Sequence, residues 1–184
     1  GVVCKGNVTK SGLPCWPGQA TFSRTIPAMN TKSTDSSPVT LEQWLAHCER
    51  LHPQGIQGIE LGLDRLREVA SRMHDGDGVR FSCPVFTVAG TNGKGSTVAF
   101  IESIARAAGL KVGSYTSPHL LRYNERVRID GEEVSDTSLV AAFEAVEAAR
   151  GETTLTYFEF GTLAALWLFQ QSALDLVVLE VGLG

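Results

Sequence analysis

The chain has 184 residues, of which 43% are hydrophobic and 20% are charged, and its formal net charge is −4 at pH 7. A chain of this length and composition can bury one hydrophobic core, as a globular protein does, with room for a tail besides. The acidic balance, without a cluster of lysine and arginine, argues against a protein that binds nucleic acid.

The spacing of the cysteines and the hydropathy of the chain exclude further classes of protein. Cys4, Cys15, Cys48 and Cys83 are widely spread, without C-x-x-C spacing or neighbouring histidines, so neither a zinc site nor a disulfide framework is indicated. We expect reduced thiols in a cytoplasmic protein, with Cys48 and Cys83 serving in packing rather than as nucleophiles. No apolar run is long enough to span a membrane, and the N-terminus lacks the apolar core of a signal peptide.

Residues 1–38 differ in composition from the rest. They hold four of the seven prolines, many Ser, Thr and Gly residues, and no apolar periodicity. Such a stretch cannot bury enough surface to offset the entropy of ordering it. We therefore expect a disordered tail or an upstream extension over 1–38, with Met29 as a candidate native start. A single α/β domain is expected over 39–184.

The first regular pattern is helical. Apolar residues follow a 3.6-residue period after Thr40, which is a fair N-cap, and this predicts a helix over 41–51. A loop rich in Gly and Gln follows over 53–62. A second amphipathic helix begins near Leu63 and ends before Gly76 and Gly78.

A strand–loop–helix–strand unit comes next. The apolar run 85–88 predicts a strand, 94–108 a helix with Gly109 just after its end, and 111–115 a second strand. This order predicts parallel strands joined by a right-handed crossover.

The loop between the first strand and its helix has the chemistry of a phosphate site. Glycines let the backbone turn its N–H groups around an anion, and a helix start adds the positive end of its dipole. Lys94 can bring an ammonium group to the outer phosphates, and a following hydroxyl can bind Mg²⁺. The spacing departs from G-x-x-x-x-G-K-[ST], because Gly90 is close to Gly93 and Gly95 separates Lys94 from Ser96. The order of parts nevertheless predicts a nucleoside triphosphate site.

The second half of the chain continues the alternation. Residues 122–128 are expected to form a strand with solvated alternate positions, and 126–129 with 132–134 a hairpin around Asp130-Gly131. Helices are predicted from Ser135 or Asp136 and over about 158–171. The continuous apolar run 176–181 is typical of a central parallel strand. The predicted fold is therefore a P-loop α/β domain with a mostly parallel sheet flanked by helices.

Two polar positions lie where ligands bind in such sheets. Glu180 ends the last strand, at the edge where a carboxylate can hold a nucleotide's Mg²⁺. On position alone, a solvent-facing or capping carboxylate is equally consistent. Ser117 follows the second parallel strand and could be a second metal ligand or part of an ordinary polar loop. His119 has no partners that indicate a catalytic triad.

Five segments together carry a resemblance to a known family. They resemble the folylpolyglutamate synthase and dihydrofolate synthase family, within the larger group of Mur-type amide ligases, over about residues 41–184. The segments are Val88–Thr97, Tyr115–Leu120, Asn124–Val127, Leu155–Glu159 and Leu179–Gly184. The unusual loop spacing is this family's own form.

The resemblance implies roles for particular residues. Lys94 and Glu180 would be catalytic, and Ser117 and Glu180 would hold Mg²⁺. The ATP phosphates would lie against Thr91, Asn92, Gly93, Lys94, Gly95, Ser96 and Thr97. The pteroate pocket would be lined by Ile59, Glu60, Leu61, Gly62, Thr156, Tyr157, Phe158 and Glu159. The loop over 54–58 is a few residues longer than the family norm.

The same resemblance implies the reaction, an ATP- and Mg²⁺-dependent ligation of L-glutamate to dihydropteroate or folate through an acyl phosphate. Family members run well past Gly184, so we expect residues 39–184 to be the N-terminal part of a Mur-ligase-type ATP-binding domain, truncated at its C-terminus. We expect little activity from this part alone and a parent enzyme that is a monomer. The expected partners are small-molecule substrates, with neither nucleic acid nor membrane. The alternatives are a peptidoglycan-type Mur ligase, a kinase or GTPase-type switch, and a non-catalytic nucleotide-binding module.

Overall fold

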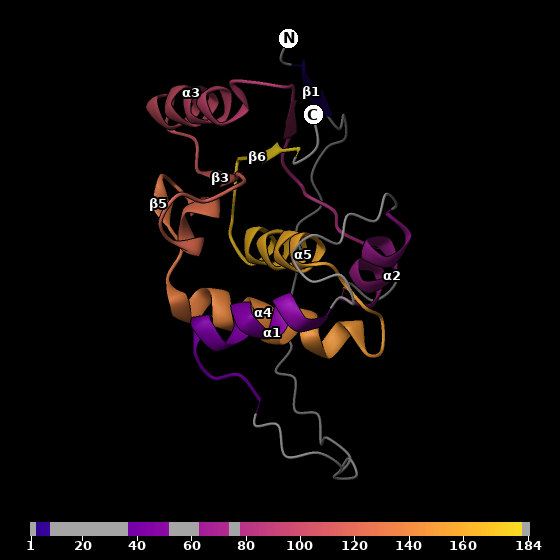
Figure 1. The fold of residues 1–184 in the computed structure, drawn as a ribbon. Helices are drawn as coiled ribbons and strands as arrows, with labels where there is room; N and C mark the ends of the chain where they lie inside the picture. The colour runs from indigo at the N-terminus through magenta and orange to yellow at the C-terminus, as the bar shows by residue number, and fades with distance from the viewer. Residues whose placement is uncertain (1–2, 8–36, 52–62, 74–77, 182–184) are drawn as a thin grey trace.

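The fold is described from a computed structural model, which covers residues 3–7, 37–51, 63–73 and 78–181. Helices and strands alternate along most of this length (Figure 1). In chain order the elements are β1 (Val3–Asn7), α1 (Leu41–Leu51), α2 (Asp64–Met73), β2 (Val85–Ala89), α3 (Lys94–Ala107), β3 (Val112–Tyr115), η2 (Tyr123–Arg126), β4 (Val127–Ile129), β5 (Glu132–Glu133), α4 (Asp136–Arg150), α5 (Tyr157–Gln170) and β6 (Leu176–Glu180).

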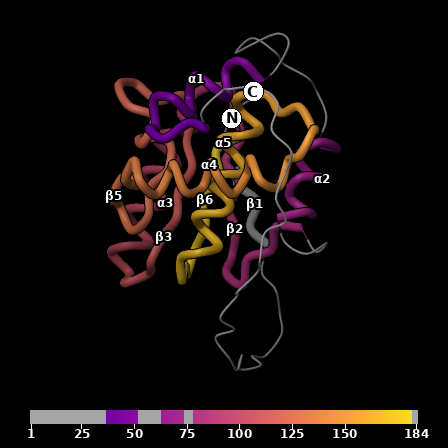
Figure 2. The backbone as a smooth tube through the Cα atoms, turned by 90° about the horizontal axis from the view of Figure 1, so that it is seen from below, coloured from indigo at the N-terminus to yellow at the C-terminus, as the bar shows by residue number. Residues whose placement is uncertain are grey.

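The strands form one sheet in the order β1-β2-β6-β3-β4-β5, which Figure 2 shows laid out across the molecule. The three central strands are parallel, and β1, β4 and β5 are added antiparallel at the two sides. In the register, Val88 pairs with Glu180, and Tyr115 pairs with Leu179. The carboxyl ends of β2, β6 and β3 therefore meet at one edge. The predicted α/β fold is confirmed, but the sheet is mixed rather than mostly parallel: its central strands are parallel, and its outer pairings are antiparallel.

Helices cover both faces of the sheet. In Figure 1, α3 lies on one side of the strands, and α5 lies on the other with α4 and α1 beyond it. Because side chains alternate along a strand, Val178 packs into the cluster under α3, whereas Val177 packs into the larger cluster under α5. The larger cluster, under α5, contains the fully buried rings of Phe143 and Phe160. Both faces of the central strands are thus buried, as their continuous apolar runs require.

Two expectations from the sequence need correction. Residues 3–7, within the expected disordered tail, form β1 and pair with β2 from Val3↔Ala89 to Asn7↔Val85. This pairing satisfies backbone groups of β2 that an edge strand would leave open. The expected strand over 122–128 is instead a 3₁₀ turn over Tyr123–Arg126 followed by β4. Its cause is the Glu125 carboxylate, which accepts hydrogen bonds from the N–H groups of residues 120, 121 and 122.

The described helices are all shorter or more polar than a bilayer span requires. α5, the most apolar of them, has 14 residues. Its burial under the sheet accounts for its composition.

Gly161 provides a test of the packing between α5 and η2. A Cβ at this position would lie 2.1 Å from the Tyr123 hydroxyl oxygen, whose ring is buried against Phe143 and Tyr157. Alanine usually stabilises a helix by about 1 kcal/mol relative to glycine. At this site we expect Gly161→Ala to lower the free energy of unfolding by about 1–3 kcal/mol through overpacking. Urea denaturation measures the change.

Removing the opposing hydroxyl is the control. Tyr123→Phe should recover most of the stability in the Gly161→Ala background, because the clash is with the oxygen. A double variant no more stable than Gly161→Ala alone would contradict this packing.

The loop held by Glu125 should depend on pH. Hydrogen bonds from the Leu120, Arg122 and Leu121 backbones hold the pKa of Glu125 below its ordinary 4.5. Because the folded pKa is lowered, the contribution is present above pH 4.5 and is lost as pH falls through the lowered value. We expect the amide resonances of these three residues to titrate together in NMR spectra with a midpoint below 4.5. Glu125→Gln should abolish that transition, and a midpoint at or above 4.5 would count against the bonds.

Candidate nucleotide and metal site

The loop over residues 90–97 joins β2 to α3 at the carboxyl edge of the sheet. Gly90 has φ 155° and Gly93 has φ 79°, in the region that favours glycine. Gly93 is the N-cap of α3, and no side chain caps this helix. The side chains of Ser135 and Thr156, in contrast, cap α4 and α5. The first N–H groups of α3 are therefore open to an anionic ligand, which the helix dipole also favours.

Lys94 lies across this loop. Its Nζ donates a hydrogen bond to the Gly90 carbonyl oxygen at 2.8 Å, so the ammonium closes over the turn that the glycines form. The Thr97 hydroxyl is turned back into the helix and donates to the Gly93 carbonyl oxygen at 2.9 Å. Thr91, Asn92 and Ser96 are exposed, as an anion-binding loop requires. The structure thus brings the predicted phosphate-binding residues together in one turn.

Glu180, the last residue of β6, lies beside the loop. Its side chain is on the α3 face of the sheet, in register with Val178. An ideal Cβ at Gly95 would be 3.9 Å from Glu180 Oε2, and the same oxygen accepts a hydrogen bond from the Ser117 N–H at 3.3 Å. Glu180 is only 8% exposed. One carboxylate therefore connects the glycine loop with the segment after β3, as the sequence predicts.

These donors fit a hard divalent cation. Mg²⁺ prefers oxygen ligands and is usually bound through one or two protein groups together with substrate phosphates. The Glu180 carboxylate and the Ser117 hydroxyl supply oxygens at this edge. No cluster of three or more His, Cys, Asp or Glu residues occurs among the residues that the structure describes. A cation bound here would thus depend on a nucleotide for the rest of its coordination.

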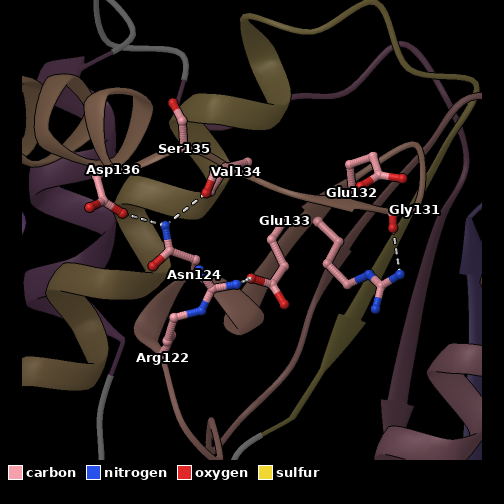
Figure 3. A pocket seen from close by; sticks show the side chains of 9 residues that line it. Arg122, Asn124, Gly131, Glu132, Glu133, Val134, Ser135 and Asp136 are labelled. Atoms are coloured by element: carbon pink, nitrogen blue, oxygen red, sulfur yellow. Dashed lines mark hydrogen bonds and ion pairs between the residues drawn. The ribbon is translucent and has the colours of Figure 1, made fainter.

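The segment after Ser117 is held by its own polar side chains. Asn124 Nδ2 donates to the Val134 carbonyl oxygen and to Asp136 Oδ1, each at 2.8 Å, which fixes η2 against the start of α4 (Figure 3). Glu125 fixes the preceding loop, and Val127 is fully buried in the core. The Asn-Glu-Arg-Val segment is therefore largely a support that places Ser117 at the sheet edge.

Arg126 is the functional candidate that the sequence reasoning missed. It was expected to be solvated, but it is 8% exposed and lies over the rings of Tyr123 and Tyr157. Its Nε donates to His119 Nδ1 at 2.8 Å. Burial, and then the charge of Arg126, lower the pKa of His119, in keeping with a neutral ring that accepts this bond. The only sign in the sequence was the presence of aromatic residues before and after Arg126, namely Tyr123 and Tyr157. Their rings meet around Arg126 only in the folded chain.

The residues predicted to line a pteroate pocket divide into two groups. Ile59, Glu60, Leu61 and Gly62 lie outside the described residues. Thr156 and Glu159 form the capping box of α5, and Glu159 also pairs with Arg65 Nη2 at 3.3 Å. Phe158 contacts Tyr115, at the end of β3, with ring centroids 6.2 Å apart. This contact brings the start of α5 to the same edge of the sheet as Ser117.

A polar hollow of about 540 Å³ lies elsewhere, between the β4–β5 hairpin and the start of α4 (Figure 3). Its side chains bind one another: Arg122 donates to Glu133 at 2.6 Å, and Arg128 donates to the Gly131 carbonyl oxygen. These contacts hold the hairpin.

Cys48 and Cys83 are poor nucleophiles. Burial raises the pKa of Cys48 to about 12, and burial also raises the pKa of Cys83. A thiol that stays protonated is unreactive at neutral pH. Packing is thus the role that the structure supports for both.

Comparison with known proteins identifies relatives of this chain. It is 53% identical over 157 residues to the dihydrofolate synthase/folylpolyglutamate synthase of Escherichia coli, covering 85% of this chain and 36% of that protein. The Haemophilus influenzae protein of the same name is 49% identical over 144 residues, covering 78% and 31%. The chain thus spans about a third of the length of these relatives. No protein-family model matches it.

Solved structures agree in fold. E. coli FolC in complex with DHPP and ADP superposes with a TM-score of 0.74 at 51% identity, covering 82% of this chain and 35% of that one. The bifunctional folylpolyglutamate synthase/dihydrofolate synthase of Yersinia pestis, with AMPPNP and Mn ion, gives 0.73 at 52% identity, covering 83% and 36%. Over the part that it spans, the chain belongs to the dihydrofolate synthase/folylpolyglutamate synthase family.

Proposed function

We propose that this chain carries the ATP, Mg²⁺ and pteroate sites of an ADP-forming ligase that joins L-glutamate to dihydropteroate or folate. The observation that carries the proposal is the meeting of the glycine loop, Ser117 and the Glu180 carboxylate at one sheet edge. Relatives that are 51% and 52% identical to this chain have been solved with ADP and DHPP, and with AMPPNP and a manganese ion. Another bifunctional folylpolyglutamate synthase/dihydrofolate synthase has been solved with Mn, AMPPNP and L-glutamate bound.

The reaction would proceed in two displacements. A carboxylate oxygen of the acceptor attacks the γ-phosphorus of ATP, and the bond to ADP breaks, giving an acyl phosphate. The glutamate amine then attacks the acyl carbon, loses a proton, and expels inorganic phosphate as the amide forms. A bound magnesium ion would neutralise charge on the phosphates during transfer.

The residues of this chain would act by positioning and charge. Lys94 would leave the Gly90 carbonyl oxygen for the outer phosphates, while the uncapped N–H groups of α3 receive the inner ones. Glu180 and Ser117 would hold the metal. The start of α5, with Tyr157 and Phe158, and residues 59–62 would receive the pteroate group.

We limit the proposal for this chain alone to binding. It spans 36% of the E. coli relative, and glutamate capture and full turnover require more than the residues assigned here. A cytoplasmic location and a monomeric parent enzyme complete the proposal.

Ligand-dependent melting tests the proposed binding. At about a hundredfold excess over Kd, a ligand stabilises the folded state by about 2.7 kcal/mol, which for a chain of this size raises Tm by roughly 5–10 °C. We expect Mg²⁺ with AMPPNP, and separately dihydropteroate, each to give such a shift.

A GTP analogue is the control, and should give a smaller shift than AMPPNP. Stabilisation by the GTP analogue without any by pterins would favour a nucleotide switch instead. Glutamate-dependent phosphate release by this chain alone would contradict the restriction to binding.

Glu180→Gln tests the shared carboxylate. The variant keeps the size of the side chain but loses the charge, so metal-dependent AMPPNP affinity should fall by about tenfold or more. Calorimetric titration with and without Mg²⁺ measures this loss, and affinity without metal should change little. Glu144→Gln, on the exposed side of α4, is the matched control and should bind like the parent chain. Equal affinities for the Glu180→Gln and parent chains would remove Glu180 from the metal site.

A further inference from the structure

Arg126 is a buried cation surrounded by neutral groups. Its guanidinium carbon lies 5.2 Å from the centre of the Tyr123 ring and 5.7 Å from that of Tyr157. Burial raises the pKa of Tyr123, Tyr157 and Tyr115, and the positive charge of Arg126 opposes that rise in all three. The phenols therefore remain uncharged at neutral pH. Its Nε is used by the bond to His119.

The carboxylates of the neighbouring segments are engaged in other contacts. Glu125 accepts the three backbone N–H groups of the preceding loop, Glu159 pairs with Arg65, and Glu180 bonds to Ser117. Within the described part of the chain, Arg126 forms no ion pair with any carboxylate. A guanidinium buried without a counter-charge is costly, because it loses hydration and gains only ring contacts and one hydrogen bond to a neutral imidazole in return.

The position of Arg126 indicates what could supply the missing charge. Its backbone oxygen accepts a hydrogen bond from the Thr116 N–H at 2.9 Å, so it lies beside the segment that ends in Ser117. Its side chain stacks on Tyr157, which opens α5 at the proposed pteroate segment. The backbone of Arg126 therefore adjoins the segment that ends at the metal edge, and its guanidinium lies on the aromatic side of the site. A substrate that extends from the aromatic side to the metal edge must present its reacting group beside this segment.

We propose that Arg126 binds the carboxylate of the acceptor substrate, the group that ATP activates, and holds it at the sheet edge for phosphoryl transfer. This inference rests on the proposed function. A guanidinium offers its terminal N–H groups as a planar pair that matches the two oxygens of a carboxylate. The cation–π contacts with the rings of Tyr123 and Tyr157 and the hydrogen bond to His119 restrict the position of the guanidinium. Other groups, Lys94 and the uncapped N-terminus of α3, are assigned to bind the phosphates.

The test compares two ligands that differ only in this group. Dihydropteroate and the same pterin with an aniline ring lacking the carboxylate are titrated into the chain by calorimetry. The chain should bind dihydropteroate roughly 10- to 100-fold more tightly, as expected for hydrogen bonds to a charged group. Arg126→Gln should remove that preference and leave affinity for the decarboxylated ligand unchanged. Arg122→Gln, an exposed arginine four positions away, is the matched control and should keep the preference.

The outcomes separate the two proposals. Equal binding of both ligands by the parent chain overturns the role of Arg126 while leaving pteroate binding intact. Binding of neither ligand overturns the proposed function and the inference with it. A loss of AMPPNP affinity in Arg126→Gln, with the carboxylate preference retained, also overturns the inference, because it assigns Arg126 to the nucleotide.

A second measurement applies if Arg126→Gln does not fold. The ¹⁵Nε resonance of Arg126 in the parent chain, assigned by its absence in Arg126→Lys, should shift on adding dihydropteroate. The decarboxylated ligand should leave it in place. A resonance that responds identically to both ligands contradicts the proposal.

Discussion

The register of the three central strands is the constraint on which the proposed site depends. β2, β6 and β3 run parallel, and the pairs Val88↔Glu180 and Tyr115↔Leu179 end them at one level. That alignment places the Glu180 carboxylate against Gly95 and the Ser117 N–H. A slip of one residue in β6 would turn Glu180 to the opposite face, away from the loop. The buried valines on both faces of β6 oppose any such slip.

The two faces of the sheet carry different parts of the proposed reaction. The α3 face holds the glycine loop, Lys94 and Glu180, which are suited to phosphates and a cation. The α5 face holds Tyr115, Tyr123 and Tyr157, whose rings pack around Arg126. Ser117 follows the end of β3, between the two. The support of this segment by Asn124 and Glu125 therefore affects both sides of the proposed site.

Features determined by local sequence were predictable. The glycine loop, its strand and its helix follow from residue order. The place of Glu180 follows from the end of an apolar run, whereas its proposed role as a metal ligand was implied only by the family resemblance. Arg126 could not be identified in this way, because its burial depends on aromatic rings from η2 and α5 meeting across the fold. The 3₁₀ turn was missed because the alternation of polar and apolar residues predicts a strand. The hydrogen bonds from three backbone N–H groups to the Glu125 carboxylate stabilise the turn instead. β1 was missed because pairing with β2, rather than composition, orders it.

A ligand can contact both faces of a sheet only where the strands end, since the packed strands separate the faces elsewhere. An acceptor bound among the aromatic rings can therefore meet a nucleotide bound under α3 only near residues 115–117 and 180. Arg126 is one backbone hydrogen bond from this point and carries a charge that its described neighbours do not balance. The same topology that brings Glu180 to the nucleotide thus explains why a cation is retained on the opposite face. A carboxylate arriving from the aromatic side would gain its counter-ion at the place where it must meet the γ-phosphate.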